Sequence, residues 1–195
     1  MSAESAIGRS DGQPPGTGLF YGWYVVAAVL VIMTVTAGLG FYNLSVYLKA
    51  FVGERGFSVS ATSGATACFF ISSGIAGLGV ASLIDRYDPR WVITAGAFMS
   101  AVATLGAGYV SELWQLYAFY ILFGIGYAGA ALIPGTTLVA RWFARRRSVA
   151  LSIASTGLSL GGILLTPVAA KLIDGLGLQD ATPWLAAGFV IGIVP

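Results

Sequence analysis

Long stretches without a charged side chain constrain the fold of this sequence more than any other feature. Six such intervals separate the Asp, Glu, Lys and Arg residues: 12–48, 56–84, 91–111, 113–140, 148–170 and 181–195. An α-helix can cross a bilayer because its backbone polar groups are all bonded within the segment. It needs about 20 apolar residues to reach from one side to the other. The first five intervals are long enough, so the sequence predicts an all-α membrane protein.

The composition agrees with a membrane location and argues against several function classes. Only 9% of the residues are charged, whereas about 25% is usual in soluble domains. The net charge of +2 gives no reason to expect a nucleic-acid partner. The chain has no His and a single cysteine, Cys68, so we expect no metal site and no cofactor. The uncharged intervals contain no carboxylate either, and the lack of these groups also argues against an integral-membrane enzyme.

The intervals predict six membrane-spanning helices, preceded by a disordered cytoplasmic tail at residues 1–19, which are small, polar and rich in Pro and Gly. The last interval offers only 15 residues and stops at Pro195, so we expect the sixth helix to be truncated. The expected spans are about 20–46, 58–84, 91–111, 113–138, 148–170 and 182–195 (incomplete), within a bundle of residues 20–195.

The positive charges predict which side of the membrane each loop faces. Short cytoplasmic loops carry an excess of Lys and Arg. A cytoplasmic N-terminus places three positive residues outside, Lys49, Arg55 and Lys171, and the other seven inside. We therefore expect a multi-pass protein of the plasma or inner membrane with its N-terminus in the cytoplasm. The seven inner residues are Arg9, Arg86, Arg90, Arg141, Arg145, Arg146 and Arg147; the last four are also expected to contact anionic membrane lipid.

Two short sequences recur at nearly equal distances. GLGFY at residues 38–42 is followed 86 residues later by GIGYA, and LID at 83–85 is followed 89 residues later by a second LID. These offsets suggest one three-helix unit used twice, although three-letter matches also arise by chance. Because three is odd, the second unit would be inverted in the membrane, which gives a 3+3 inverted repeat as in many secondary transporters.

Residues 81–90, ASLIDRYDPR, resemble the turn between the second and third helices of the major facilitator superfamily. That turn typically reads Gly-x-Leu-x-Asp-Arg-x-Gly-x-Arg/Lys. Ala81 and Asp88 stand where the family has glycine, and the residues that match are Leu83, Asp85, Arg86 and Arg90. Residues 141–147, RWFARRR, are similar to the oxalate/formate antiporter and monocarboxylate transporter branch of that superfamily. The resemblance covers residues 20–195.

The resemblance implies the N-terminal half of a secondary transporter that works by alternating access, with a C-terminal six-helix half as its partner. It also implies that Asp85, Arg86 and Arg90 act as a cytoplasmic gating latch, whereas the simpler interpretation is that they only label a cytoplasmic turn. A half-length transporter that functions as a homodimer, and a membrane receptor that does not transport, are the alternatives.

Substrate sites in this fold lie near the bilayer midplane, where polar groups are costly and therefore worth attention. Packing in the core is the competing interpretation for each tyrosine. The spans contain no charged residue, so recognition of an organic anion such as a mono- or dicarboxylate would rest on the other half; the alternative is a neutral or drug-like solute. The candidates to line the cavity for this small-molecule substrate are Tyr42, Asn43, Tyr120, Gly124, Tyr127, Thr156 and Ser159.

Overall fold

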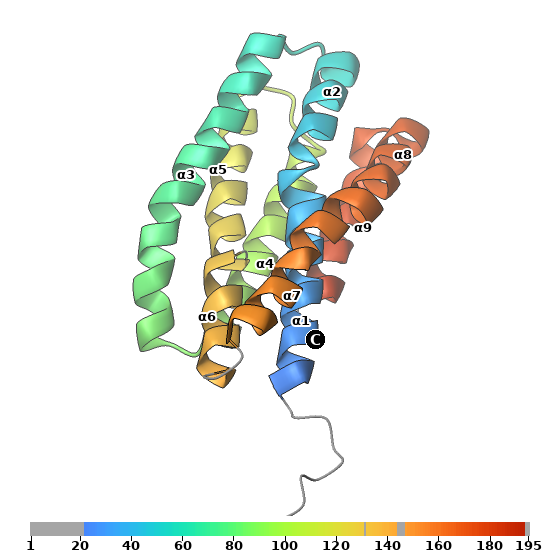
Figure 1. Cartoon of the computed structure of the whole chain (residues 1–195). Coiled ribbons are helices and arrows are strands. Elements are labelled where there is room, and N and C mark those ends of the chain that lie inside the picture. The colour runs from blue at the N-terminus through green and yellow to red at the C-terminus, as the bar shows by residue number, and fades with distance from the viewer. Residues whose placement is uncertain (1–21, 131, 144–146, 194–195) are drawn as a thin grey trace, which may run out of the picture.

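The computed structural model describes residues 22–130, 132–143 and 147–193, and in these ranges the chain is a bundle of helices without strands (Figure 1). Two of the helical segments, η1 and η2, are π-helical and interrupt longer helices. In chain order the elements are α1 (Gly22–Val35), η1 (Thr36–Phe41), α2 (Leu44–Arg55), α3 (Val59–Arg86), α4 (Pro89–Ala107), α5 (Leu113–Ala130), α6 (Leu132–Trp142), α7 (Arg147–Leu160), η2 (Gly161–Leu165), α8 (Thr166–Leu176) and α9 (Leu178–Ile193).

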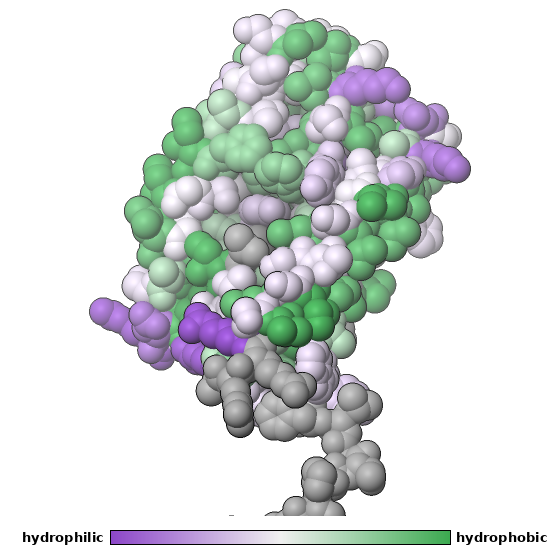
Figure 2. Space-filling model, viewed as in Figure 1, coloured by the Kyte–Doolittle hydropathy of each residue, from purple (hydrophilic) through white to green (hydrophobic). Residues whose placement is uncertain are grey.

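Five helical runs are long and apolar enough to cross a membrane. Three of them join consecutive elements, and the other two are α3 and α4 alone. We call the five runs spans 1 to 5, and α9, which has 16 residues, is the shorter sixth helix. The hydrophilic residues visible in Figure 2 gather at the two ends of the molecule, and the surface between them is largely hydrophobic. This confirms the predicted all-α membrane fold. The five spans are Gly22–Arg55, Val59–Arg86, Pro89–Ala107, Leu113–Trp142 and Arg147–Leu176.

The first and fifth spans run further than the uncharged intervals suggested. Span 1 continues past Lys49 to Arg55, and span 5 continues past Lys171 and Asp174 to Leu176. Lys49, Lys171 and Asp174 are exposed at one end of the bundle, where a helix projects toward the membrane surface and its charge meets water, and Arg55 is half-buried there. We call this the upper end, after Figure 1, and define it by residues 56–58, 108–112 and 177; the lower end carries residues 87–88 and the α6–α7 connection.

The turns between spans have local causes that can be read from the residues. Gly56 and Gly177 end α2 and α8 with φ of 70° and 82°, a backbone conformation that glycine adopts without strain. The Ser58 hydroxyl accepts a hydrogen bond from the Ala61 amide and starts α3. The Asp88 carboxylate accepts one from the Arg90 amide and starts α4, with Pro89 in the first helical turn. Thus Asp88, which departs from the family pattern, is a helix cap.

Helix crossings made by glycine support the predicted repeat. A β-carbon at Gly38 in span 1 would lie 2.6 Å from the Gly161 carbonyl oxygen in span 5. A β-carbon at Gly124 in span 4 would collide with Ser72 in span 2. Gly124 is Gly38 plus 86 residues, and Gly161 is Ser72 plus 89 residues, which are the two repeat offsets. The 1–5 and 4–2 crossings are therefore equivalent contacts, as expected for two inverted copies of a three-helix unit.

The main core lies between α2, α3, α4, α5 and α9. The rings of Phe69 and Phe123 are tilted against each other with centroids 5.3 Å apart, and Phe189 meets Phe123 edge to face at 5.9 Å. Span 3 and span 4 approach at Gly96, where a β-carbon would lie 2.7 Å from the Gly126 carbonyl oxygen. Such close backbone contact supplies dispersion contacts that stabilise helix pairs in lipid, where the hydrophobic effect does not drive them together.

Candidate functional site

Spans 1 and 5 are both interrupted by a π-helical segment, and the two segments pack against each other. The π-helix is rare in proteins and occurs mostly as short insertions that are frequent at functional sites. In span 1 the segment Thr36–Phe41 is followed by a turn at Tyr42 and Asn43 before α2 begins. Span 1 thus remains one helical run that contains a widened turn, because Tyr42 and Asn43 keep right-handed helical backbone angles.

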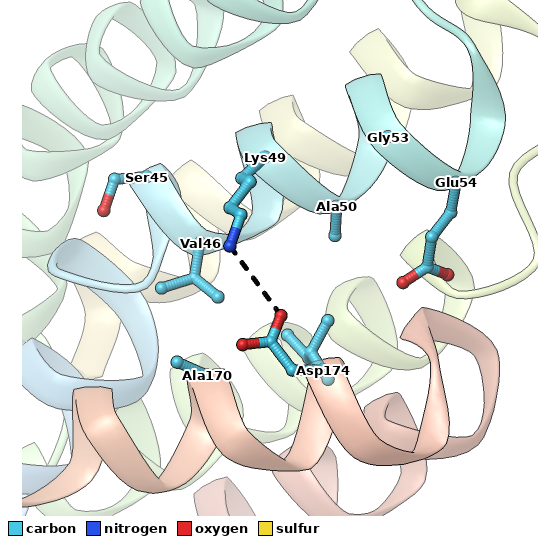
Figure 3. Close-up of a pocket in the computed structure, with 9 residues that line it drawn as sticks. Ser45, Val46, Lys49, Ala50, Gly53, Glu54, Ala170 and Asp174 are labelled. Atoms are coloured by element: carbon cyan, nitrogen blue, oxygen red, sulfur yellow. Dashed lines mark ion pairs between the residues drawn. The ribbon is translucent and has the colours of Figure 1, made fainter.

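Above this crossing, α2 and α8 diverge and leave an open groove of about 420 Å³ (Figure 3). The Lys49 Nζ lies 3.9 Å from the Asp174 Oδ1 across the groove. Glu54 closes its top, because the Glu54 Oε2 accepts a hydrogen bond of 2.9 Å from the Leu178 amide at the start of α9. The upper groove therefore carries one ammonium and two carboxylates, one of which is engaged in a backbone hydrogen bond.

A second groove of about 350 Å³ adjoins the first below Ser45, which lines both. Its polar side chains come from span 1 (Tyr42 and Ser45) and from span 5 (Ser159 and Thr166). The Tyr42 ring is 41% exposed and lies over Gly162, where a β-carbon would be 3.0 Å from the ring. We call the two grooves together the 1–5 groove. It brings together two predicted site residues, Tyr42 and Ser159.

The other predicted cavity residues lie elsewhere. Asn43 and Tyr120 are buried in the core, with exposed fractions of 0% and 3%. Gly124 packs against Ser72 and the Phe69 carbonyl of span 2, so its missing side chain serves a helix crossing. Tyr127 is half-buried, with its ring 5.4 Å from that of Phe69. Thr156 is exposed outside the groove and donates to the Ser152 carbonyl oxygen of its own helix.

The predicted latch residues occupy the lower end. Asp85 and Arg86 are exposed in the last turn of α3, and Arg90 is exposed in the first turn of α4. Within the described residues, no ion pair joins Asp85 to either arginine. The Arg141 guanidinium donates a hydrogen bond of 3.0 Å to the Ile84 carbonyl oxygen and so caps the C-terminus of α3 from span 4. Arg147 starts α7 and is exposed, whereas Arg145 and Arg146, like the predicted tail at residues 1–19, lie outside the described residues.

Sequence reasoning missed Ser45, Lys49, Thr166 and Asp174 as groove residues. Lys49 was interpreted only as an outer positive charge at the end of an uncharged interval, and Asp174 only as part of the repeated LID sequence. A usable signal was present, because Tyr42, Ser45 and Lys49 recur at three and four residues and so share one face of a helix. The described residues contain no group of three or more metal-ligating side chains. Hydroxyls and a pair of opposite charges suit binding of a small polar solute.

A family model described as Major Facilitator Superfamily matches residues 30–195. The chain belongs to this superfamily. The match confirms the family predicted from residues 81–90, and with the apolar spans it makes the chain an integral, multi-pass membrane protein.

Curated relatives are mixed in what their names say they carry. MFS-type transporter 1 of an Ophiocordyceps species is 29% identical over 86% of this chain and 36% of its own length. Human monocarboxylate transporter 11 is 26% identical over 94% of this chain and 38% of its own length. The phosphoglycerate transporter protein of Salmonella typhimurium is 24% identical over 65% of this chain and 27% of its own length. The chain thus spans at most about two fifths of the length of these relatives.

Proposed function

We propose that the chain forms one half of a secondary transporter that moves a small organic anion across the membrane by alternating access. Membership in a transporter family favours transport over catalysis, and the coverage of the relatives leaves room for a C-terminal six-helix half. The single observation that carries the proposal is the 1–5 groove, a polar lining built on two interrupted spans of a membrane bundle. The second half would close over this groove.

The charge of the substrate is inferred from Lys49. Two relatives are named for organic anions, a monocarboxylate and phosphoglycerate. Lys49 is a cation in the groove, and its partner Asp174 holds it at 3.9 Å in a weak, exposed pair. A substrate carboxylate can replace Asp174 on Lys49 at little cost, because exposed pairs contribute about 0–1 kcal/mol. Positive groups of the second half would complete the recognition.

We further propose that the N-terminus and the lower end face the cytoplasm, as the arginine excess indicates. The 1–5 groove then opens toward the outside. Asp85, Arg86 and Arg90 would form the cytoplasmic latch against the second half. Asp85 is exposed and has no ion-pair partner among the described residues, which fits a carboxylate that meets its partner outside this chain.

A neutral or drug-like solute is the second candidate. The observation in its favour is a relative named agnestins efflux protein, from Paecilomyces divaricatus, which is 29% identical over 84% of this chain and 37% of its own length. Apolar groove residues such as Ile163 suit that class as well. A homodimer of this chain would replace the proposal if the functional protein is found to assemble in that way. A receptor that does not transport would replace it if flux assays with the full-length protein show no flux.

Uptake into proteoliposomes tests the proposal. Proteoliposomes that contain the full-length protein are loaded with unlabelled solute. They are then assayed for exchange with labelled monocarboxylates, phosphoglycerate and neutral analogues. Lys49→Gln should raise the KM for the anion about tenfold, as expected for loss of one charge-assisted hydrogen bond. The matched control is Lys171→Gln, an exposed lysine of α8 that does not line the groove. Flux of neutral analogues alone, or equal KM values for both variants, would overturn the anion assignment.

A further inference from the structure

Aromatic side chains of spans 1 and 2 form an exposed patch on the bundle. The Phe41 ring lies 5.3 Å from that of Tyr42 and 5.9 Å from that of Phe70, centroid to centroid, and both pairs meet edge to face. The Phe41, Tyr42 and Phe70 side chains are 43%, 41% and 49% exposed. We call these three residues the aromatic patch. Its rings touch one another and still present surface to a further ligand.

The aromatic patch lies near the middle of the two spans that form it. Tyr42 lies within about four residues of the centre of span 1, Gly22–Arg55, and Phe70 within about three of the centre of span 2, Val59–Arg86. At 1.5 Å per residue, each ring is therefore within about 5 Å of the middle of its span. Secondary transporters bind their substrates at this depth.

The surface beside the aromatic patch is polar, which argues that the patch faces the transport path and not lipid. Tyr42 also lines the lower part of the 1–5 groove, where every other polar side chain carries a hydroxyl. Lys49 lines the upper part. Polar and ionisable groups within spans almost always face the bundle interior or a water-filled cavity, because hydrocarbon does not solvate them. The aromatic patch and Lys49 thus belong to one continuous surface.

Other rings hold the aromatic patch in place from below. Phe70 meets the fully buried Phe69 edge to face at 5.2 Å, and the Phe69 ring lies 5.4 Å from that of Tyr127. Gly40 makes room for Tyr127, because a β-carbon there would lie 3.1 Å from the ring. The Tyr127 side chain also lies near Tyr42. These contacts fix the ring planes, so a ligand meets a patch that is already ordered.

The chemistry of the aromatic patch favours a ligand with an aromatic ring and a carboxylate. A third ring that enters the patch gains edge-to-face or offset-stacked contacts, which a saturated ring of the same size does not. Tyr42 and Lys49 are seven residues apart, about 10 Å along the helix, and both line the 1–5 groove. This separation favours a carboxylate joined to the ring by a short carbon chain.

From these observations we propose that the aromatic patch binds the ring of an aryl-substituted carboxylate while Lys49 binds its carboxylate. The proposal rests on the proposed transport of an organic anion and narrows that class to anions with an aromatic ring. Tyr42 is the residue that joins the two parts of the site, because it belongs both to the aromatic patch and to the 1–5 groove.

Exchange in proteoliposomes that contain the full-length protein tests the proposal. The labelled solutes are phenylpropionate, cyclohexylpropionate, which has a saturated ring of the same size, and butyrate, which has no ring. The KM for phenylpropionate should be about fivefold lower than that for cyclohexylpropionate, because only the aromatic ring gains edge-to-face contacts. Equal KM values, or a lower value for cyclohexylpropionate, would mean that lipid or side chains of the second half cover the patch, and would overturn the proposal.

A matched pair of variants assigns the preference to the aromatic patch. Phe70→Leu keeps an apolar side chain and should raise the KM for phenylpropionate about fivefold, with no change for cyclohexylpropionate. Phe41→Leu should have the same effect and replaces the first variant if that one does not fold. The control is Phe98→Leu, an exposed phenylalanine of α4 outside the patch and the groove. The same phenylpropionate KM in the Phe70 and Phe98 variants would overturn the proposal.

A binding measurement separates failure of the aromatic patch from failure of anion transport. Phenylpropionate should raise the midpoint of thermal unfolding of the full-length protein more than cyclohexylpropionate does at the same concentration. That result without exchange of any carboxylate would support the patch and overturn the proposed transport. Exchange of butyrate with equal midpoints for the two ring compounds would support the transport and overturn the patch.

Discussion

At the residue scale, Asp88, one of the two residues that depart from the family pattern, has a structural role. Asp88 replaces a glycine and caps α4 through the Arg90 amide. Both glycine and aspartate serve well at this position, because an aspartate accepts a hydrogen bond from the first turn and a glycine leaves that turn open to water. The side-chain oxygen of Asp88 is therefore explained by the helix it starts, and the Asp85 carboxylate nearby remains the candidate for the latch.

Substitutions of Asp88 should separate the effect of its helix cap from the effect of its charge. Asp88→Ala should lower the free energy of unfolding by about 1 kcal/mol, because the cap is lost, while Asp88→Gly should cost only a few tenths. Asp88→Asn, which keeps a capping oxygen and removes the charge, should leave stability unchanged. The measurement is the unfolding free energy of the purified protein in detergent. Equal destabilisation by the alanine and asparagine variants would mean that charge, and not capping, is the contribution.

At the element scale, backbone contact between glycines fixes how spans 1 and 5 cross. Gly38 and Gly161 lie where the two π-helical segments meet, and no side chain separates them. The repeat offsets predicted which helices correspond. The π-helical segments were not predictable, because a widened turn leaves no pattern in the residues and depends on how the neighbouring helix packs.

Adding one methyl group tests that crossing. Gly38→Ala places a β-carbon 2.6 Å from the Gly161 carbonyl oxygen and should destabilise the protein by about 1–3 kcal/mol, because the Gly161 backbone and the Leu165 β-carbon beside it cannot rotate aside. Gly74→Ala is the control, since no atom lies within 4 Å of its β-carbon position. It should have no effect or a slight stabilising one. Thermal unfolding in detergent measures both, and equal midpoints would contradict the contact.

At the scale of the whole molecule, the sequence predicted much of the fold and little of the groove. Uncharged intervals located all five spans, because charges are expelled from hydrocarbon regardless of how helices pack. They also misplaced the upper ends, where Lys49 and Asp174 continue a helix. The groove needs the relative position of α2 and α8, and Asn43 was assigned to it although Asn43 faces the core. Tyr42 is exposed and its neighbour Asn43 is buried, and this difference can be predicted only when the local turn is known.

The proposed latch is also a property of the whole molecule, and it predicts a shift between the two states of the transport cycle. In the full-length protein, Asp85→Asn should slow transport and populate the inward-open state, because the neutral amide weakens the contact that closes the cytoplasmic side. Labelling of cysteines placed on the cytoplasmic side measures the shift. Asp88→Asn is the matched control, since it removes the same charge three residues away. Identical labelling of the two variants would contradict a specific latch at Asp85.

The bonds at the upper end also determine how force passes through the bundle. α2 faces α8 through the weak pair of Lys49 and Asp174, and Glu54 joins it to the start of α9, whereas its link to α1 runs through a widened turn and two turn residues that keep helical backbone angles. α2 is therefore held more firmly at its C-terminal end than at Lys49, and the groove can widen beside Lys49 at little cost while Glu54 and Arg55 keep their partners.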